Sequence, residues 1–343
     1  RPVGGKRQAR HAARSHGIGI RPRSAARARK RRRNRDGPRH VHISAARGNV
    51  QIAAAQRRQI DSLLNLIKYD NDDTIKVKHL ISVGLRYEDL KYFDSALFFA
   101  NNSYQLAEKL NYKIGIIAFW RSMGHINMHK GNHSIAMNFL LKSLQMSEEA
   151  KDKKGIALSL YRFGELYNMR NDYTLALDYF SKAEKIFEEI KDTDYIATIW
   201  RYRADINFDK MEYNEAIKNV FKALQLNQQI KNKTEVASNY NALGVIFFRL
   251  NDYSKAMDYF LKALKIGEEE NDKWEMIEVF SCLGALYNNL QDEAATKKYF
   301  SIALMLSEEL GDKVGSAHIL YNLGDEYLTF KDPNTALHLY IKA

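Results

Sequence analysis

Apolar and small residues recur along this chain with a period of 40 residues. One small residue stands at the same place in each of seven consecutive segments, at Gly84, Gly124, Gly164, Ala204, Gly244, Gly284 and Gly324. Four residues before it stands a large apolar side chain, at Leu80, Trp120, Leu160, Trp200, Tyr240, Phe280 and Leu320. The large residues around it are spaced three or four apart, which places them on one helix face, and short polar turns such as Arg170-Asn171-Asp172 interrupt the pattern. The sequence therefore predicts seven helix pairs.

Further positions follow each small residue at fixed distances. Twelve residues on stands Ala96, Ala136, Ala176, Ala216, Ala256, Thr296 or Ala336. Sixteen residues on stands Ala100, Leu140, Phe180, Val220, Phe260, Phe300 or Tyr340. A residue without a large side chain lets two helix backbones approach closely, so we expect the glycine of one helix to meet the next helix there. A single pair exposes its apolar face, and stability requires several stacked pairs.

One segment shows the pattern most completely, as Tyr240-x2-Leu243-Gly244-x2-Phe247 followed by Ala256-x3-Phe260. It resembles the tetratricopeptide repeat family, whose period is about 34 residues. The period of 40 and the lack of a proline closing the second helix point to a long-helix branch. That branch includes kinesin light chains, cell-polarity adaptors and bacterial peptide-sensing and sensor-kinase proteins. The resemblance implies an all-α fold, a right-handed α-solenoid of antiparallel helix pairs, over residues 77–343 with the last repeat truncated.

Residues 51–76 precede the repeats and are expected to form a capping helix, from about 52 to 68, and a linker. The stretch from Gln59 to Leu80 looks like the start of the sensor region of bacterial signalling proteins. In those proteins a histidine kinase, nucleotide cyclase or transcription regulator module usually follows. This resemblance keeps open the alternative that the chain is a sensor region whose output module is missing.

Composition agrees with a helical protein that has an ordinary core. Of the 343 residues 45% are hydrophobic and four are proline. The single cysteine, Cys282, excludes a disulfide framework within the chain and a cysteine-rich zinc site. The sequence contains no uninterrupted apolar stretch of the roughly 18 residues that a transmembrane helix needs.

The net charge of +12 is unevenly distributed. Residues 1–60 contain 16 Arg and 2 Lys against one acid, so this tail carries +17 and the rest of the chain −5. We expect disorder over about 1–50. Three interpretations of the tail remain open: an arm that binds nucleic acid, centred on residues 27–35; an organelle transit peptide; or a segment not native to the folded protein.

The resemblance also implies where a ligand would bind. In relatives the first helices line a concave groove that holds a peptide or a partner helix, and residues three before and one after the glycine face it. The candidate peptide-binding residues are therefore Arg121, His125, Tyr161, Glu165, Arg201, Asp205, Asn241, Tyr321 and Asp325. Arg121 and Arg201 could grip a carboxylate while tyrosines pack a side chain. Alternatively, these arginines pair with Glu165 and Asp205 across adjacent helices.

Polar residues interrupt the apolar rows in two repeats. Arg203 stands where the other repeats have an apolar residue, and Asn127 and Asn207 stand where most have Tyr or Phe. A polar group on a packing face must find a partner or reach water. Either these residues open the stack locally and shape the groove, or Arg203 extends to solvent while the asparagines bond to each other or to nearby backbone.

No catalytic constellation is visible in the sequence. His125, His129 and His133 are spaced four and four, which on a helix can hold a metal, but His133 is expected in the following turn and surface histidines are the simpler interpretation. Cys282 is expected to be a small packing residue. The sequence has no glycine-rich phosphate loop, G-x-S-x-G or H-E-x-x-H motif. We therefore expect no enzyme activity and no cofactor or metal.

The function predicted from these features is noncovalent binding of a protein or peptide ligand in the concave groove, as a scaffold or adaptor. Two alternatives remain: the sensor region of a bacterial signalling protein, and nucleic-acid binding through the arginine-rich tail.

Overall fold

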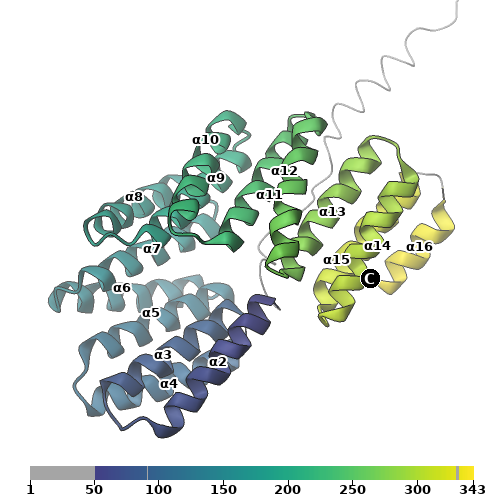
Figure 1. The fold of residues 1–343 in the computed structure, drawn as a ribbon. Coiled ribbons are helices and arrows are strands. Elements are labelled where there is room, and N and C mark those ends of the chain that lie inside the picture. The colour runs from purple at the N-terminus through teal and green to yellow at the C-terminus, as the bar shows by residue number, and fades with distance from the viewer. Residues whose placement is uncertain (1–50, 91, 330–331) are drawn as a thin grey trace, which may run out of the picture. The chain divides into compact units, whose positions relative to one another are not determined.

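The computed structural model describes residues 51–90, 92–329 and 332–343. The predictions of disorder and of nucleic-acid binding for residues 1–50 concern a segment outside these described residues. Within the described part, the secondary structure consists of fifteen helices and no strands (Figure 1). None of the helices in this part is long and apolar enough to span a membrane.

The helices follow one another at regular intervals. Each of α4 to α15 is 17 residues long. Their bounds are α2 (Gln51–Tyr69), α3 (Thr74–Asp89), α4 (Phe93–Lys109), α5 (Lys113–His129), α6 (His133–Glu149), α7 (Lys153–Met169), α8 (Tyr173–Glu189), α9 (Thr193–Asp209), α10 (Tyr213–Gln229), α11 (Lys233–Arg249), α12 (Tyr253–Glu269), α13 (Lys273–Asn289), α14 (Glu293–Glu309), α15 (Lys313–Thr329) and α16 (Pro333–Lys342).

Packing follows the chain order. Each odd-numbered helix from α3 to α15, the first helix of a repeat, packs against the even-numbered helix that follows it. Each second helix from α4 to α14 then packs against the first helix of the next repeat, and α2 packs against α3. Some first helices also contact each other directly, as α3 with α5, α5 with α7 and α11 with α13. The fold is therefore the expected all-α solenoid of helix pairs.

The turns that join the helices recur every 20 residues with the same backbone geometry. In the turns after α4 to α14, the second residue after the helix end has a positive φ, for example 58° at Asn171 and 79° at Gly131. In the turn after α7, the N–H of Asp172 donates to the carbonyl of Tyr167 at 2.9 Å, which closes the helix end as a Schellman motif. Asp172 then caps the next helix by accepting from the N–H of Leu175.

The repeating glycine allows a buried ring from the second helix to lie against the first. A Cβ added at Gly244 would lie 2.5 Å from the ring of Phe260, and one added at Gly164 would lie 2.5 Å from the ring of Phe180. Both rings are fully buried. Where the small residue is Ala204, the partner sixteen residues on is the smaller Val220. The two positions therefore compensate each other in volume.

This compensation predicts opposite effects of the same substitution at two glycines. Gly244→Ala is expected to lower the free energy of unfolding by about 1–3 kcal/mol, because the added methyl group collides with the ring of Phe260. Gly84→Ala is the matched control. Its Cβ would have ordinary contacts, the nearest at 3.6 Å, so the better helix propensity of alanine is expected to raise stability by up to about 1 kcal/mol. Urea unfolding followed by circular dichroism measures both; equal effects would contradict the compensation.

Candidate functional site

Polar side chains from four successive first helices meet in the N-terminal half of the repeats. We call them the first-helix cluster: Glu88 of α3, Arg121, His125 and His129 of α5, Arg162 and Glu165 of α7, and Tyr202 of α9. Of this set, only Arg121, His125 and Glu165 were among the binding candidates chosen from the sequence. Arg162 and Tyr202 occupy a shared row in which the other repeats have Ser82, Ser122, Ala242, Cys282 and Asn322. Their size and polarity in that row are the signal that could have identified them.

Glu165 is the acid at the centre of this cluster. Its side chain is 9% exposed, and it accepts a hydrogen bond from the Arg162 guanidinium at 2.6 Å and one from the Tyr202 hydroxyl at 2.8 Å. Burial by itself would raise the pKa of the Glu165 carboxyl, but the positive charges of Arg162 and His125 and these two hydrogen bonds outweigh it and lower that pKa to about 2. Glu165 is therefore ionised and its charge is balanced within the protein.

A second acid, Glu88, is held by histidine. Its Oε2 lies 2.7 Å from Nδ1 of His125, and Nε2 of His125 lies 3.1 Å from Nε2 of His129. Glu88 is 1% exposed, and this burial raises the pKa of its carboxyl to about 7 despite the positive charges of Arg162 and Arg121 nearby. A hydrogen bond between two nitrogen atoms needs one donor and one acceptor, so only one of the two Nε2 atoms carries a proton. The three groups thus form a short proton-sharing chain between α3 and α5.

Arg121 is different from the other charged members of the cluster. It is half-buried, and within the described residues it donates no hydrogen bond and forms no ion pair. Burial lowers the pKa of its guanidinium, and the like charge of Arg162 adds to this effect, while Tyr195, Glu88 and Asp152 oppose it. The expected pairing of Arg121 with Glu165 is absent, because Arg162 occupies that carboxylate from the same helix.

The other arginine of the predicted row pairs within its own helix. The Arg201 guanidinium lies 3.2 Å from Oδ1 of Asp205, one turn further along α9, rather than bridging two helices as expected. Arg201 is buried, while the Asp205 side chain is 43% exposed. Asn241 is buried and its amide lies 3.4 Å from Oε2 of Glu278.

The two candidate tyrosines lie in different environments. Tyr161 is buried, with its ring 5.3 Å from that of Tyr195 and 5.9 Å from that of Phe180, so it belongs to the core. Tyr321 is 55% exposed, and Asp325 on the same helix accepts a hydrogen bond from Tyr340. The structure therefore gathers Arg121, His125 and Glu165 into one cluster and keeps Tyr321 and Asp325 in the last repeat. The assignment of these candidates to a binding groove stays a prediction.

Arg203 and Asn127, two of the residues that interrupt the apolar rows, have partners within the protein. The Arg203 guanidinium lies 2.7 Å from Oε2 of Glu184 and 4.4 Å from the ring centre of Trp200, and it donates to the Ser181 hydroxyl at 3.0 Å. The Asn127 amide donates to the backbone carbonyl of Met123 at 2.8 Å, as the local alternative predicted. Arg203 is thus held by α8 rather than extended into solvent, which corrects that expectation.

The structure gives no support to a three-histidine metal site. His133 is the first residue of α6, not part of the preceding turn, and His125 is buried rather than a surface histidine; both findings correct the expectations from the sequence. Across residues 51–90, 92–329 and 332–343 no group of three or more His, Cys, Asp or Glu side chains is placed to hold a metal ion. Cys282 is buried and burial raises the pKa of its thiol, so it is the packing residue that was predicted.

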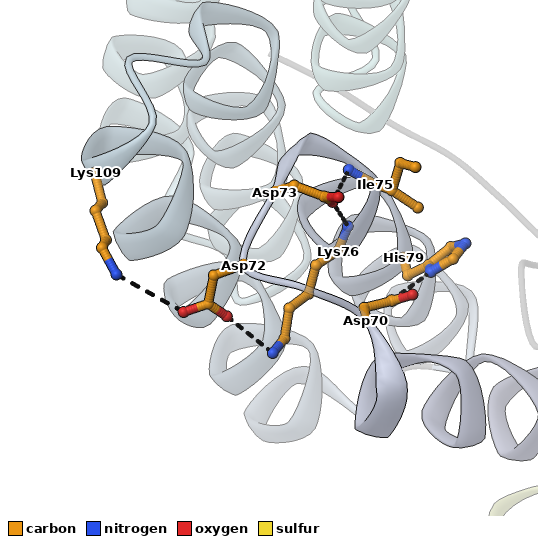
Figure 2. A network of polar contacts seen from close by, with 7 residues as sticks. All are labelled: Asp70, Asp72, Asp73, Ile75, Lys76, His79 and Lys109. Carbon is orange, nitrogen blue, oxygen red and sulfur yellow. Dashed lines mark hydrogen bonds and ion pairs between the residues drawn. The ribbon is translucent and has the colours of Figure 1, made fainter.

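A further polar network lies at the loop between α2 and α3 (Figure 2). Asp73 caps α3 by accepting from the backbone N–H groups of Ile75 and Lys76 at 2.7 and 3.1 Å. Asp72 lies 3.0 Å from the Lys76 ammonium and 3.7 Å from that of Lys109 on α4. These acids stabilise a helix end and a contact between helices, which explains their presence without a ligand.

The regular helix pairs and the repeated glycine contact define the class of protein. Residues 115–189 and 195–269 match the model of the tetratricopeptide repeat family, and the same 40-residue pattern continues on both sides of them. Residues 115–189 and 195–269 are tetratricopeptide repeats, and the resemblance drawn from the sequence is confirmed. No curated protein sequence matches the chain.

Several solved structures share the fold at low sequence identity. Aspartyl phosphate phosphatase F from Bacillus subtilis superposes with a TM-score of 0.59 at 14% identity, covering 88% of this chain and 94% of its own. The quorum sensor NprR from B. thuringiensis, in its apo form, gives 0.57 at 16% identity and covers 84% and 81%. NprR in complex with its cognate peptide NprX gives 0.54 at 15% identity and covers 82% and 80%. At these identities the likeness establishes the fold alone.

Proposed function

We propose that this protein binds a peptide, or an extended segment of a partner protein, along the side of its first helices. The observation that carries the proposal is the first-helix cluster, in which polar side chains of α3, α5, α7 and α9 lie together. A ligand placed against it would contact several consecutive repeats at once, which is how solenoid surfaces bind extended chains. The fold shared with NprR, which was solved with a cognate peptide, supports the same function.

The chain is proposed to act through binding rather than through chemistry. The buried thiol of Cys282 and the internally balanced Glu165 are groups that hold the fold together. The expectation that the chain is not itself an enzyme stays a prediction.

The proposal is tested with a soluble synthetic library of random hexapeptides that have free carboxyl termini. Binders to the purified protein are identified by affinity selection and mass spectrometry, and their affinities are measured by fluorescence anisotropy. Thr198→Trp places a large ring on the first helix α9, at a half-buried position that shares a helix face with Arg201 and Asp205. Glu188→Trp is the matched control, exposed on the second helix α8.

Thr198→Trp is expected to weaken binding of the selected peptides by at least about tenfold, since a steric block in a close contact costs more than about 1.4 kcal/mol. Glu188→Trp is expected to leave the affinity within about twofold. Thermal unfolding of both variants is recorded to show that each is folded. Failure of the library to give any saturable binder, or weakening only in Glu188→Trp, would contradict the proposed function.

A further inference from the structure

Two histidines on the first helix α5 face each other through their ring nitrogens. His125 and His129 are four residues apart, and their Nε2 atoms lie 3.1 Å from each other. Their ring planes cross at 88° with the ring centres 4.6 Å apart. Histidines four residues apart on a helix can bind one metal ion together. The pair therefore presents two imidazole nitrogens to a single point.

Neighbouring helices fix both rings in this orientation. Nδ1 of His125 lies 2.7 Å from Oε2 of Glu88 on α3, and both residues are buried. The ring of His129 stacks on that of Phe93 on α4, with the ring centres 5.8 Å apart. When Nδ1 of His125 donates its proton to the carboxylate, Nε2 keeps a lone pair. A carboxylate bonded to the far nitrogen of a histidine in this way is the common arrangement behind zinc-binding histidines.

The separation of the two nitrogens suits a transition-metal ion. With metal–nitrogen bonds of about 2.0–2.1 Å, the 3.1 Å between the Nε2 atoms gives a nitrogen–metal–nitrogen angle of about 100°. This angle lies between those of square-planar and tetrahedral sites. Imidazole nitrogens bind zinc, copper and nickel, whereas Mg²⁺ and Ca²⁺ prefer oxygen ligands. The chemistry of the pair therefore selects a transition metal over the hard cations.

The pair occurs in one repeat only. At the position of His125 the other repeats have Leu85, Glu165, Asp205, Val245, Ala285 and Asp325. At the position of His129 they have Asp89, Met169, Asp209, Arg249, Asn289 and Thr329. The packing of helix pairs does not require histidine at either position, since the other repeats do without it. The two histidines therefore have a role that is local to the second repeat.

We propose that the Nε2 atoms of His125 and His129 bind a zinc ion, which departs from the expectation of no metal drawn from the sequence. Glu88 positions His125 and is not itself a ligand. On binding, the proton held between the two Nε2 atoms passes to Nδ1 of His129 or to the solvent. Water or an external donor completes the coordination, as no third ligating side chain completes a metal-binding group in the described part of the chain. His129 is half-buried, which gives the ion a route from water.

The site is tested by titrating ZnCl₂ into the full chain, stripped of metal with EDTA, in an isothermal calorimeter. The chain has other histidines, so the difference between variants is the quantity that decides. The wild type is expected to bind one equivalent of zinc more than His129→Gln. His133→Gln, which changes the next histidine along the chain at the start of α6, is the matched control and is expected to bind as the wild type does.

Two further measurements address the positioning residue and the wild type alone. Glu88→Gln is expected to weaken this zinc site by at least about tenfold, because the amide still accepts from Nδ1 of His125 but carries no negative charge. Diethyl pyrocarbonate modifies imidazole nitrogens that are not bound to metal, and mass spectrometry of the digested protein locates the modified residue. Zinc is expected to protect His129 in the wild type and to leave His318, which is exposed on α15, unprotected.

Several results would overturn the zinc site. Equal zinc stoichiometry in the wild type and in a folded His129→Gln protein is one, and an equal loss in His133→Gln is another. Unchanged modification of His129 at saturating zinc would also overturn it, and this measurement needs no variant. Circular dichroism of each variant verifies that a lost equivalent does not come from loss of the fold. Because no peptide takes part in these experiments, their failure would leave the proposed function standing.

Discussion

Phe260→Ala is expected to lower the free energy of unfolding by about 3–5 kcal/mol, the cost of removing a large side chain from a packed core. The ring of Phe260 is 1% exposed and lies against Gly244, in the space that the glycine leaves open. Helices α11 and α12 meet there, so the substitution opens a cavity inside one repeat. Urea unfolding measured by circular dichroism at 222 nm gives the change.

Phe221→Ala is the matched control for this substitution. Phe221 belongs to α10 and is 43% exposed, so its removal is expected to cost less than about 1 kcal/mol. Similar costs for Phe221→Ala and Phe260→Ala would show that the glycine contact is not the packing centre of the repeat. Because each repeat contacts only its neighbours, the loss at Phe260 is expected to weaken the stack at that point first.

Glu165→Leu is expected to destabilise the protein by about 3–5 kcal/mol at pH 7, because it leaves the Arg162 guanidinium buried without its acid. The effect depends on pH in a defined direction. The pKa of Glu165 is lowered to about 2 in the folded protein from an ordinary 4.5, so its contribution to stability is complete above pH 4.5 and is lost as the pH falls toward 2. The difference between wild type and variant is therefore expected to shrink as the pH falls below about 4.5.

A double substitution provides the control for Glu165. Arg162→Met combined with Glu165→Leu removes both charges and is expected to recover most of the lost stability, since a buried ion pair replaced by apolar groups is close to neutral. The unfolding free energies of the two single variants and the double variant at pH 7 complete the cycle. A double variant as unstable as the Glu165→Leu protein would show that volume, not charge, sets the cost.

The repeat could be predicted from sequence because its cause is local and periodic. Gly164 and Phe180 stand at the same spacing as Gly244 and Phe260, and helix geometry alone requires residues so spaced to meet across a hairpin. The structure places both pairs in contact. Seven copies of one pattern indicate where the helices lie, which helices pair and in what order the pairs stack. The fold class could therefore be predicted from the pattern.

The partners of the polar side chains could not be predicted in the same way. Arg162 bonds to Glu165 and Arg121 does not, and which arginine reaches that carboxylate depends on rotamers and on the rotation between successive repeats. The 40-residue pattern carries no information on either. Tyr161 was placed on the binding row by its position, yet it lies in the core because Tyr195 of the next repeat covers it.

Local sequence also left the effect of Arg203 undetermined. An arginine on a packing face can extend to water or find an acid, and the choice depends on the neighbouring repeat. Glu184 and Ser181 of α8 supply acceptors and Trp200 supplies a ring, so the side chain stays within the stack.

The proposed function requires that the ligand lies against the first helices of repeats two to four. Photo-crosslinking with a benzophenone-bearing version of a selected hexapeptide tests this most directly, because mass spectrometry of the digested complex identifies the helices that the peptide touches. Crosslinks to α5, α7 and α9 are expected. Crosslinks confined to the second helices α6, α8 and α10 would contradict the proposed function.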